Sequence, residues 1–405
     1  MRGPRAAFVA GALGAAVVAC TAVWGFQRIE PGPADAEAPE ASSLPPPMEA
    51  SVPPDAPPSD AASDAFDASC VHARWPPPPH VPDDDASVGD IVLAFKVLDL
   101  NPADPIGLDL DDECTCPGPQ SCAIPAPFLS DAAACDESNG RDLVSNDLLG
   151  IVGTVLSVDA TGAFQEAITN GTSNWLLRIR AYNGQPDDPN VVVELFVSRG
   201  TVLPDGGIYG VPRFDGTDVW RIDDSLVSEL TADAAPSGYV SETFDIAAYV
   251  SGGILVAQPG MLGDDGGTVA PVFGNALAGK TLGNGNPLEL WLSDLTLVGR
   301  LVQGDAGTFS LVDGMAGGRL PSQGPYGALA SFNNVCLSPK VAPAAVALLC
   351  ESLDLMTRAA DDGKAMPCDA ISFGAAFEAT PAMLGPLVAR PPLIPCDASV
   401  GQCSH

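Results

Sequence analysis

A run of acidic and amide side chains in the first half of the chain has the residue types that bind a metal ion. It comprises Asp99, Asn101, Asp104, Asp109, Asp111 and Asp112, followed by Glu113 directly before Cys114. Calcium takes about six to eight oxygen ligands, and carboxylates in a loop held by disulfides could supply them. The spacing differs from that of an EF-hand loop, and solvated loop acids are the alternative interpretation. The segment therefore predicts a candidate Ca²⁺ site, and nothing in the sequence indicates another cofactor.

The positions of the histidines restrict the catalytic chemistry. His72 and His80 precede the predicted folded body, and His405 is the last residue. A Ser-His-Asp site, a Cys-His site and a His-bearing zinc site are therefore not expected in the core. The glycine-rich and serine motifs of nucleotide-binding proteins and hydrolases are also missing.

Paired carboxylates can hydrolyse a glycosidic bond without a histidine. The acids predicted to lie within strands are Glu194, Glu289 and Asp294. Acids in the middle of a strand are more often part of a solvated face. Glycan hydrolysis by such a pair is therefore the alternative to a non-catalytic role.

One aromatic residue on a predicted strand stands beside charged residues that could contact a ligand. Tyr182 follows Arg178 and Arg180, next to a predicted turn. Sugar rings stack on such aromatic side chains, so we expect these three residues to be candidates for ligand contact. Trp220 and Trp291 are expected to fill the core instead.

The N-terminus has the layout of an export signal. Arg2 and Arg5 precede an apolar run over residues 6–19, which closes on small residues and Cys20. The tetrapeptide over residues 17–20 resembles the lipobox of bacterial lipoproteins, and this resemblance implies that Cys20 is acylated and that the protein is attached to a membrane. An uncleaved signal anchor and an ordinary cleaved signal are the alternatives. All three predict that the body of the protein lies outside the cytoplasm, and the lipobox resemblance implies a lipid anchor in the cell envelope.

The charge of the chain indicates which partners to expect. It has 51 acidic against 18 basic residues, a net charge of −33. Nucleic acid binding requires clustered Lys and Arg, so a nucleic acid partner is excluded. Attachment to an anionic membrane would need a covalent anchor. Such a surface favours solubility and divalent cations.

The cysteines predict a disulfide framework, because the chain is expected to be exported. Apart from Cys20, they form two clusters of five: Cys70, Cys114, Cys116, Cys122 and Cys135, then Cys336, Cys350, Cys368, Cys396 and Cys403. Each cluster has an odd number of members. If all of them pair, at least one bridge must join the two clusters.

The composition predicts four segments. Residues 1–26 are the signal or anchor, and residues 27–90 form a Pro-, Ala- and Asp-rich linker that is expected to be disordered. Residues 91–335 contain short alternating strands between turn signals, with a Cys-rich loop at 101–141. This pattern predicts a mainly β fold, an antiparallel β-sandwich or jelly roll.

The last segment, residues 336–405, is expected to form a small helical cap. Apolar residues from Val346 to Met356 recur at helical spacing, and Asp369 could begin a second helix that carries Ile371 and Phe377. A disulfide between Cys350 and Cys368 would hold this cap together.

Together these features predict a lipid-anchored protein of the envelope or cell surface with a non-catalytic binding or structural role. A polysaccharide is the candidate ligand, by analogy with lectin-like sandwiches. The alternative function is a carboxylate-based glycan hydrolase.

Overall fold

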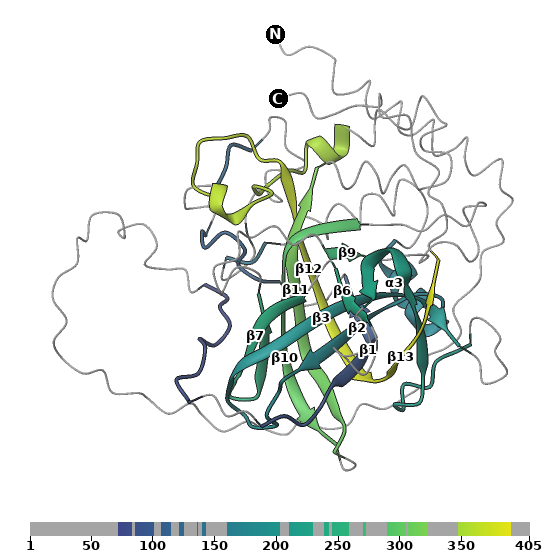
Figure 1. The fold of residues 1–405 in the computed structure, drawn as a ribbon. Coiled ribbons are helices and arrows are strands. Elements are labelled where there is room, and N and C mark those ends of the chain that lie inside the picture. The colour runs from purple at the N-terminus through teal and green to yellow at the C-terminus, as the bar shows by residue number, and fades with distance from the viewer. Residues whose placement is uncertain are drawn as a thin grey trace, which may run out of the picture. The chain divides into compact units, whose positions relative to one another are not determined.

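The structure is a computed structural model that describes part of the chain (Figure 1). The described residues are 72–82, 86–100, 107–114, 121–124, 136, 140–142, 160–202, 210–229, 239–242, 245–258, 270–272, 290–304, 307–322 and 347–389. All of them belong to one compact unit, Phe66–His405. The predicted signal, with Cys20, and the linker up to residue 71 lie outside the described residues.

Eight antiparallel strands form a closed β-barrel. They are β1 (Ile91–Asp99), β2 (Asn174–Arg180), β3 (Asp188–Thr201), β7 (Asp245–Ser251), β8 (Ile254–Ala257), β10 (Leu290–Gln303), β11 (Phe309–Pro321) and β12 (Ala370–Pro381). Their order around the barrel is β3-β2-β1-β12-β11-β10-β8-β7, and pairing of β7 with β3 closes the ring.

The mainly β composition is confirmed, but the predicted sandwich or jelly roll is wrong. The long strand β3 explains the difference, because its two halves have different neighbours on one edge. Residues from Asp188 to Glu194 pair with β7, whereas Ser198 and Thr201 pair with β4 (Val219–Asp223). The first pairing closes the sheet on itself, which a strand pattern read from the sequence does not reveal.

The barrel interior is filled by the apolar side chains that alternate along the strands. Phe95 on β1 stacks on Phe377 of β12, with ring centroids 4.6 Å apart, and meets the edge of Trp175 on β2 at 5.5 Å. Helix α3 (Ala160–Thr169) packs Phe164 and Ile168 against the same core. The sequence analysis predicted no helix here.

Additional strands cover the outer face of the barrel beside β1, β2 and β3. They are β4, the short pair β5 (Val227–Glu229) and β6 (Tyr239–Ser241), and β13 (Met383–Val388), which runs parallel to β4. The 3-10 turn η1 (Asp224–Leu226) links β4 to β5, and β9 (Ala270–Val272) pairs with β10. Leu176 and Phe196 on the outer face pack against Trp220, Ile222 and Tyr239 of this layer. Both faces of β2 and β3 are therefore buried.

A second part of the outer face, on β7, β8, β10 and β11, is covered by chain that precedes β1 and by the segment that follows β1. Tyr249, Val256 and Val298 form an apolar cluster with Leu108, and Trp75 packs against it. The Tyr249 hydroxyl donates to the Pro76 carbonyl at 2.5 Å. Residues 72–82 thus contact the body, although they were assigned to the linker.

The predicted helical cap over residues 336–405 is wrong. The described part of this region has one helical turn at 347–350, the 3-10 turn η2 (Ala359–Asp361), and the strands β12 and β13. Strand β12 lies between β1 and β11 in the barrel (Figure 1). Ile371 and Phe377 have buried side chains within this strand, together with Phe373 and Ala375. These positions alternate with period two, and that pattern, rather than Asp369 as a helix cap, decides the structure.

The disulfide between Cys122 and Cys368 joins the two cysteine clusters across 246 residues. It overturns the predicted bridge between Cys350 and Cys368. Cys114 and Cys350 each take part in a further disulfide. The other cysteines predicted to form disulfides lie outside the described residues: Cys70, Cys116, Cys135, Cys336, Cys396 and Cys403.

No helix among the described residues is long and apolar enough to cross a membrane.

Candidate cation-binding site

The acidic segment over residues 107–114 lies on the outer face of the barrel. Leu108 packs directly on the backbone of β11 at Gly317, where an added Cβ would approach the Leu108 side chain to 2.9 Å. Arg319, also on β11, donates to the Leu110 carbonyl. The Leu110 amide in turn donates to the Asp142 carboxylate at 2.7 Å. The barrel therefore provides a rigid platform for this loop.

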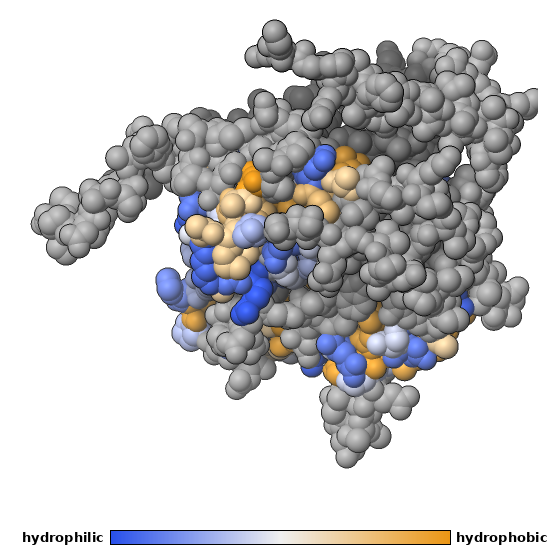
Figure 2. Space-filling view, turned by 90° about the horizontal axis from the view of Figure 1, so that it is seen from above, coloured by the Kyte–Doolittle hydropathy of each residue, from blue (hydrophilic) through white to orange (hydrophobic). Residues whose placement is uncertain are grey.

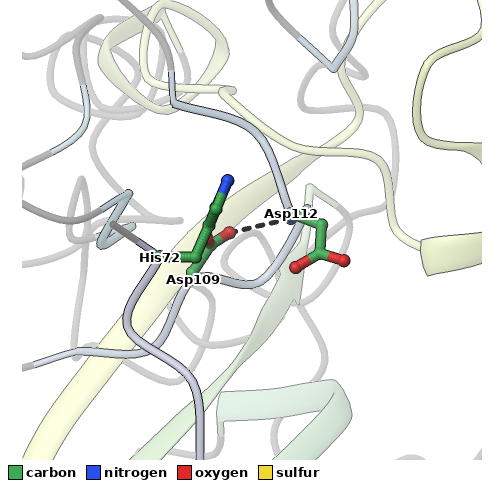
Figure 3. Close-up of side chains that lie close together, drawn as sticks. All are labelled: His72, Asp109 and Asp112. Atoms are coloured by element: carbon green, nitrogen blue, oxygen red, sulfur yellow. Dashed lines mark hydrogen bonds and ion pairs between the residues drawn. The ribbon is translucent and has the colours of Figure 1, made fainter. Parts of the chain in front are cut away.

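Two groups of side chains, formed by this loop and by residues from neighbouring segments, place possible ligand atoms within 4.8 Å of one another. The first group contains the carboxylates of Asp109, Asp111 and Asp142. The second contains His72, Asp109 and Asp112, which are drawn in Figure 3. Asp109 belongs to both groups, so the two candidate sites overlap.

The structure brings together only part of the predicted calcium set. Asp109, Asp111 and Asp112 lie in the two groups, whereas Asp99 is an exposed residue at the end of β1 and belongs to neither group. Asn101 and Asp104 lie outside the described residues.

His72 and Asp142 were not predicted from the sequence as residues of this site. His72 is close to Cys70 and Trp75, and a cysteine and a tryptophan inside a proline-rich segment were the available signal that this part is structured. Nothing local marks Asp142, which comes 31 residues after Asp111 in the sequence. Its place in the cluster follows from the hydrogen bonds that join residues 140–142 to the acidic segment.

Hydrogen bonds fix the orientation of the central carboxylates. Asp109 is hydrogen-bonded through Oδ2 to Nδ1 of His72, and its Oδ1 accepts from the Asp112 amide at 2.8 Å (Figure 3). Asp111 accepts from the Glu113 amide at 3.0 Å. The Asp109 side chain also lies against Gly140, where an added Cβ would come within 2.7 Å of Oδ2.

Burial and like charge raise the pKa values of Asp109 and Asp142. Burial raises the pKa of Asp109 to about 7, although its hydrogen bond with His72 opposes the shift. Burial also raises the pKa of Asp142 well above its usual value, and the charges of Asp111, Asp136 and Asp354 raise it further. A cation at this position would stabilise the ionised carboxylates, so protons and a cation compete for them.

Arg319 balances part of the acidic charge beside this cluster. The buried Arg319 pairs with Asp362 at 2.6 Å and lies 3.8 Å from Asp294. Burial lowers the pKa of Arg319, but its hydrogen bonds with Asp362 and the negative charges of Asp362, Asp294 and Asp142 together outweigh this and raise the pKa overall. Asp294, a residue of the alternative hydrolase pair, thus contacts the arginine and also accepts from the Ala359 amide at 3.1 Å.

The residues predicted to contact a ligand have other partners. Arg178 is buried and paired with Glu194, and Arg180 pairs with the same carboxylate at 2.9 Å. Tyr182 is 3% exposed and donates to the Gln185 carbonyl. These contacts indicate a structural role for all three residues.

The alternative catalytic residue Glu194 is equally buried within its ion pairs. Glu289 lies outside the described residues. Trp220 is buried in the outer layer, as expected for a residue of a core, and the Trp291 side chain is not described. Figure 2 shows hydrophilic and hydrophobic residues interspersed on the described part of the face seen from above.

No protein-family model, no curated protein and no solved structure matches this chain. The function is therefore argued from the chemistry of the described residues.

Proposed function

We propose that this protein has a non-catalytic binding or structural role at the cell envelope, and that its acidic loop binds calcium. The observation that carries the proposal is the convergence of the Asp109, Asp111 and Asp142 carboxylates within 4.8 Å. All three donors are hard oxygen ligands of the kind that calcium prefers. A polysaccharide remains the candidate ligand only by analogy, because the aromatic and arginine residues first considered for it are engaged within the protein.

The fit of these residues to calcium can be judged from the donors alone. Three carboxylates supply up to six oxygens, of which one each on Asp109, Asp111 and Asp142 already accepts a backbone amide. The second oxygen of Asp109 is hydrogen-bonded to His72, and calcium would have to replace that contact. The remaining oxygens, with water, suit an ion that tolerates irregular coordination. The partly buried position strengthens the attraction between the ion and the carboxylates.

Calcium should raise the thermal stability of the full chain by a few degrees at saturating concentration, because it binds only the folded state. The measurement is the melting temperature at neutral pH in chelator and then in excess calcium. Asp111→Asn should remove most of this shift. Asp99→Asn is the matched control, since Asp99 lies outside both groups, and it should respond to calcium like the unchanged chain. An equal melting temperature with chelator and with calcium would refute the proposal.

The membrane attachment is a separate part of the proposal and rests on residues 17–20. Cys20→Ala should abolish lipid labelling and shift the full chain from the detergent phase to the aqueous phase when it is expressed with its own signal in a lipoprotein-processing host. Cys122→Ala is the matched cysteine control, because this residue is disulfide-bonded and should leave labelling unchanged. Unaltered maturation and partitioning of the Cys20 variant would contradict the lipid anchor.

A further inference from the structure

His72 lies in the candidate site but is not one of the proposed calcium ligands. It reaches Asp109 from a segment 37 residues earlier in the chain, and its side chain is 14% exposed. Residues 72–82 are held on the barrel by the Tyr249–Pro76 hydrogen bond and by packing of Trp75. The position of the imidazole is thus built by tertiary contacts.

The donor set of this second group differs from that of the first. His72, Asp109 and Asp112 offer one nitrogen and two carboxylates within 4.8 Å of one another. Calcium rarely accepts an imidazole, whereas zinc and related transition-metal ions prefer a mixed nitrogen and oxygen set. Three protein ligands also leave a fourth tetrahedral position for water.

We propose that His72, Asp109 and Asp112 bind a transition-metal ion of the zinc class. The proposal does not require that calcium binds, but the two ions would compete because both groups use Asp109. A histidine-bearing zinc site was excluded from the sequence, because His72 was placed in the linker. Its contact with Asp109 removes that objection.

Cys114 and Arg74 lie beside the candidate site and affect which side chains can bind the ion. Cys114 Sγ lies 3.9 Å from the His72 ring, but Cys114 is disulfide-bonded and has no thiolate to offer. Arg74 pairs with Asp112 at 2.9 Å, and both side chains are largely exposed. The ion would displace the arginine from Asp112 and the proton shared by His72 and Asp109. It would also join residues 72–82 more firmly to the body.

The experiment uses the full chain, stripped of metal by a chelator and titrated with zinc chloride by calorimetry and by thermal melting. His72→Ala should weaken zinc binding by at least about tenfold, by analogy with losses at the supporting shell of metal sites. His80→Ala is the matched control, because His80 is exposed and lies outside the cluster, and it should bind zinc unchanged. Asp109→Asn should impair the response to zinc and to calcium alike.

Arg74→Gln is expected to strengthen zinc binding, whereas His72→Ala weakens it. Removing a competing positive charge from Asp112 should tighten zinc binding several-fold. The substitution is at an exposed position and should leave folding unchanged. Zinc binding that is equal in the unchanged chain and in His72→Ala, or absent from both, would overturn the proposal. Asp142→Asn distinguishes the calcium site from the zinc site, because it should weaken the calcium response and leave zinc binding intact. If the unchanged chain binds zinc but not calcium, only the proposed calcium function is refuted.

Discussion

Glu194→Gln should lower the free energy of unfolding by about 3–5 kcal/mol, because it leaves a buried arginine without its counter-ion. Arg178 and Glu194 lie directly opposite each other on β2 and β3, and both side chains are fully buried. Glu194 also receives the Ser241 amide at 3.3 Å and the Arg180 guanidinium at 2.9 Å. Chemical denaturation followed by circular dichroism would measure the loss.

The buried pair has further contacts that make the arginine hard to accommodate alone. Arg178 donates to the Tyr239 carbonyl at 2.9 Å and stands over the Phe196 ring at 5.2 Å. Replacing both charges by apolar residues, in Arg178→Met with Glu194→Leu, should recover part of the stability, since no isolated buried charge of that pair remains.

A matched control for Glu194 is available on β12. Glu378→Gln changes an exposed strand acid and should alter stability by less than about 0.5 kcal/mol. A Glu194→Gln variant as stable as the Glu378 variant would contradict the structural role. Loss of glycan turnover with unchanged stability would instead restore the hydrolase alternative.

The stability of the protein should fall as the pH rises from 5 to 8 in the presence of chelator. Burial raises the pKa of Asp354 from 3.8 to about 7, and the charges of Asp111 and Asp136 add to this, while hydrogen bonds from Ser372 oppose it. The folded state therefore holds a proton that the unfolded state has already lost. The resulting stabilisation is fully present below pH 3.8 and disappears as the pH passes through about 7.

For this one carboxyl the expected loss between pH 5 and pH 8 is roughly 2 kcal/mol. Asp354→Asn should make the profile shallower, and the raised pKa values of Asp109 and Asp142 should account for the slope that remains. The amide oxygen of Asn can still accept from the Ser372 amide, which the carboxylate meets at 2.8 Å. Urea denaturation at several pH values measures the slope. Asp313→Asn, at an exposed position, is the control and should leave the slope unchanged. An identical pH profile for the Asp354 variant and the unchanged chain would contradict the assignment.

The sequence predicted the elements whose pattern is local. Short alternating strands were predicted over residues 91–335, and β1, β2 and β3 lie within that range. The prediction failed where two patterns competed, as in β12, where Asp369 suggested the start of a helix. It also misjudged Arg178, because an alternating charged residue is normally exposed, and the layer formed by β4, β6 and β13 buries it.

Residue type and spacing over a few positions are enough to give the acidic composition, the strand-forming segments, the cysteine clusters and the acidic loop that contains Asp109 and Asp111. The closure of the sheet, the pairing of Cys122 with Cys368, and the approach of His72 and Asp142 to Asp109 arise in the folded protein. Each of these contacts joins segments that are distant in sequence. Pairing between strands and packing of loops on the barrel select them, and no local periodicity encodes that choice.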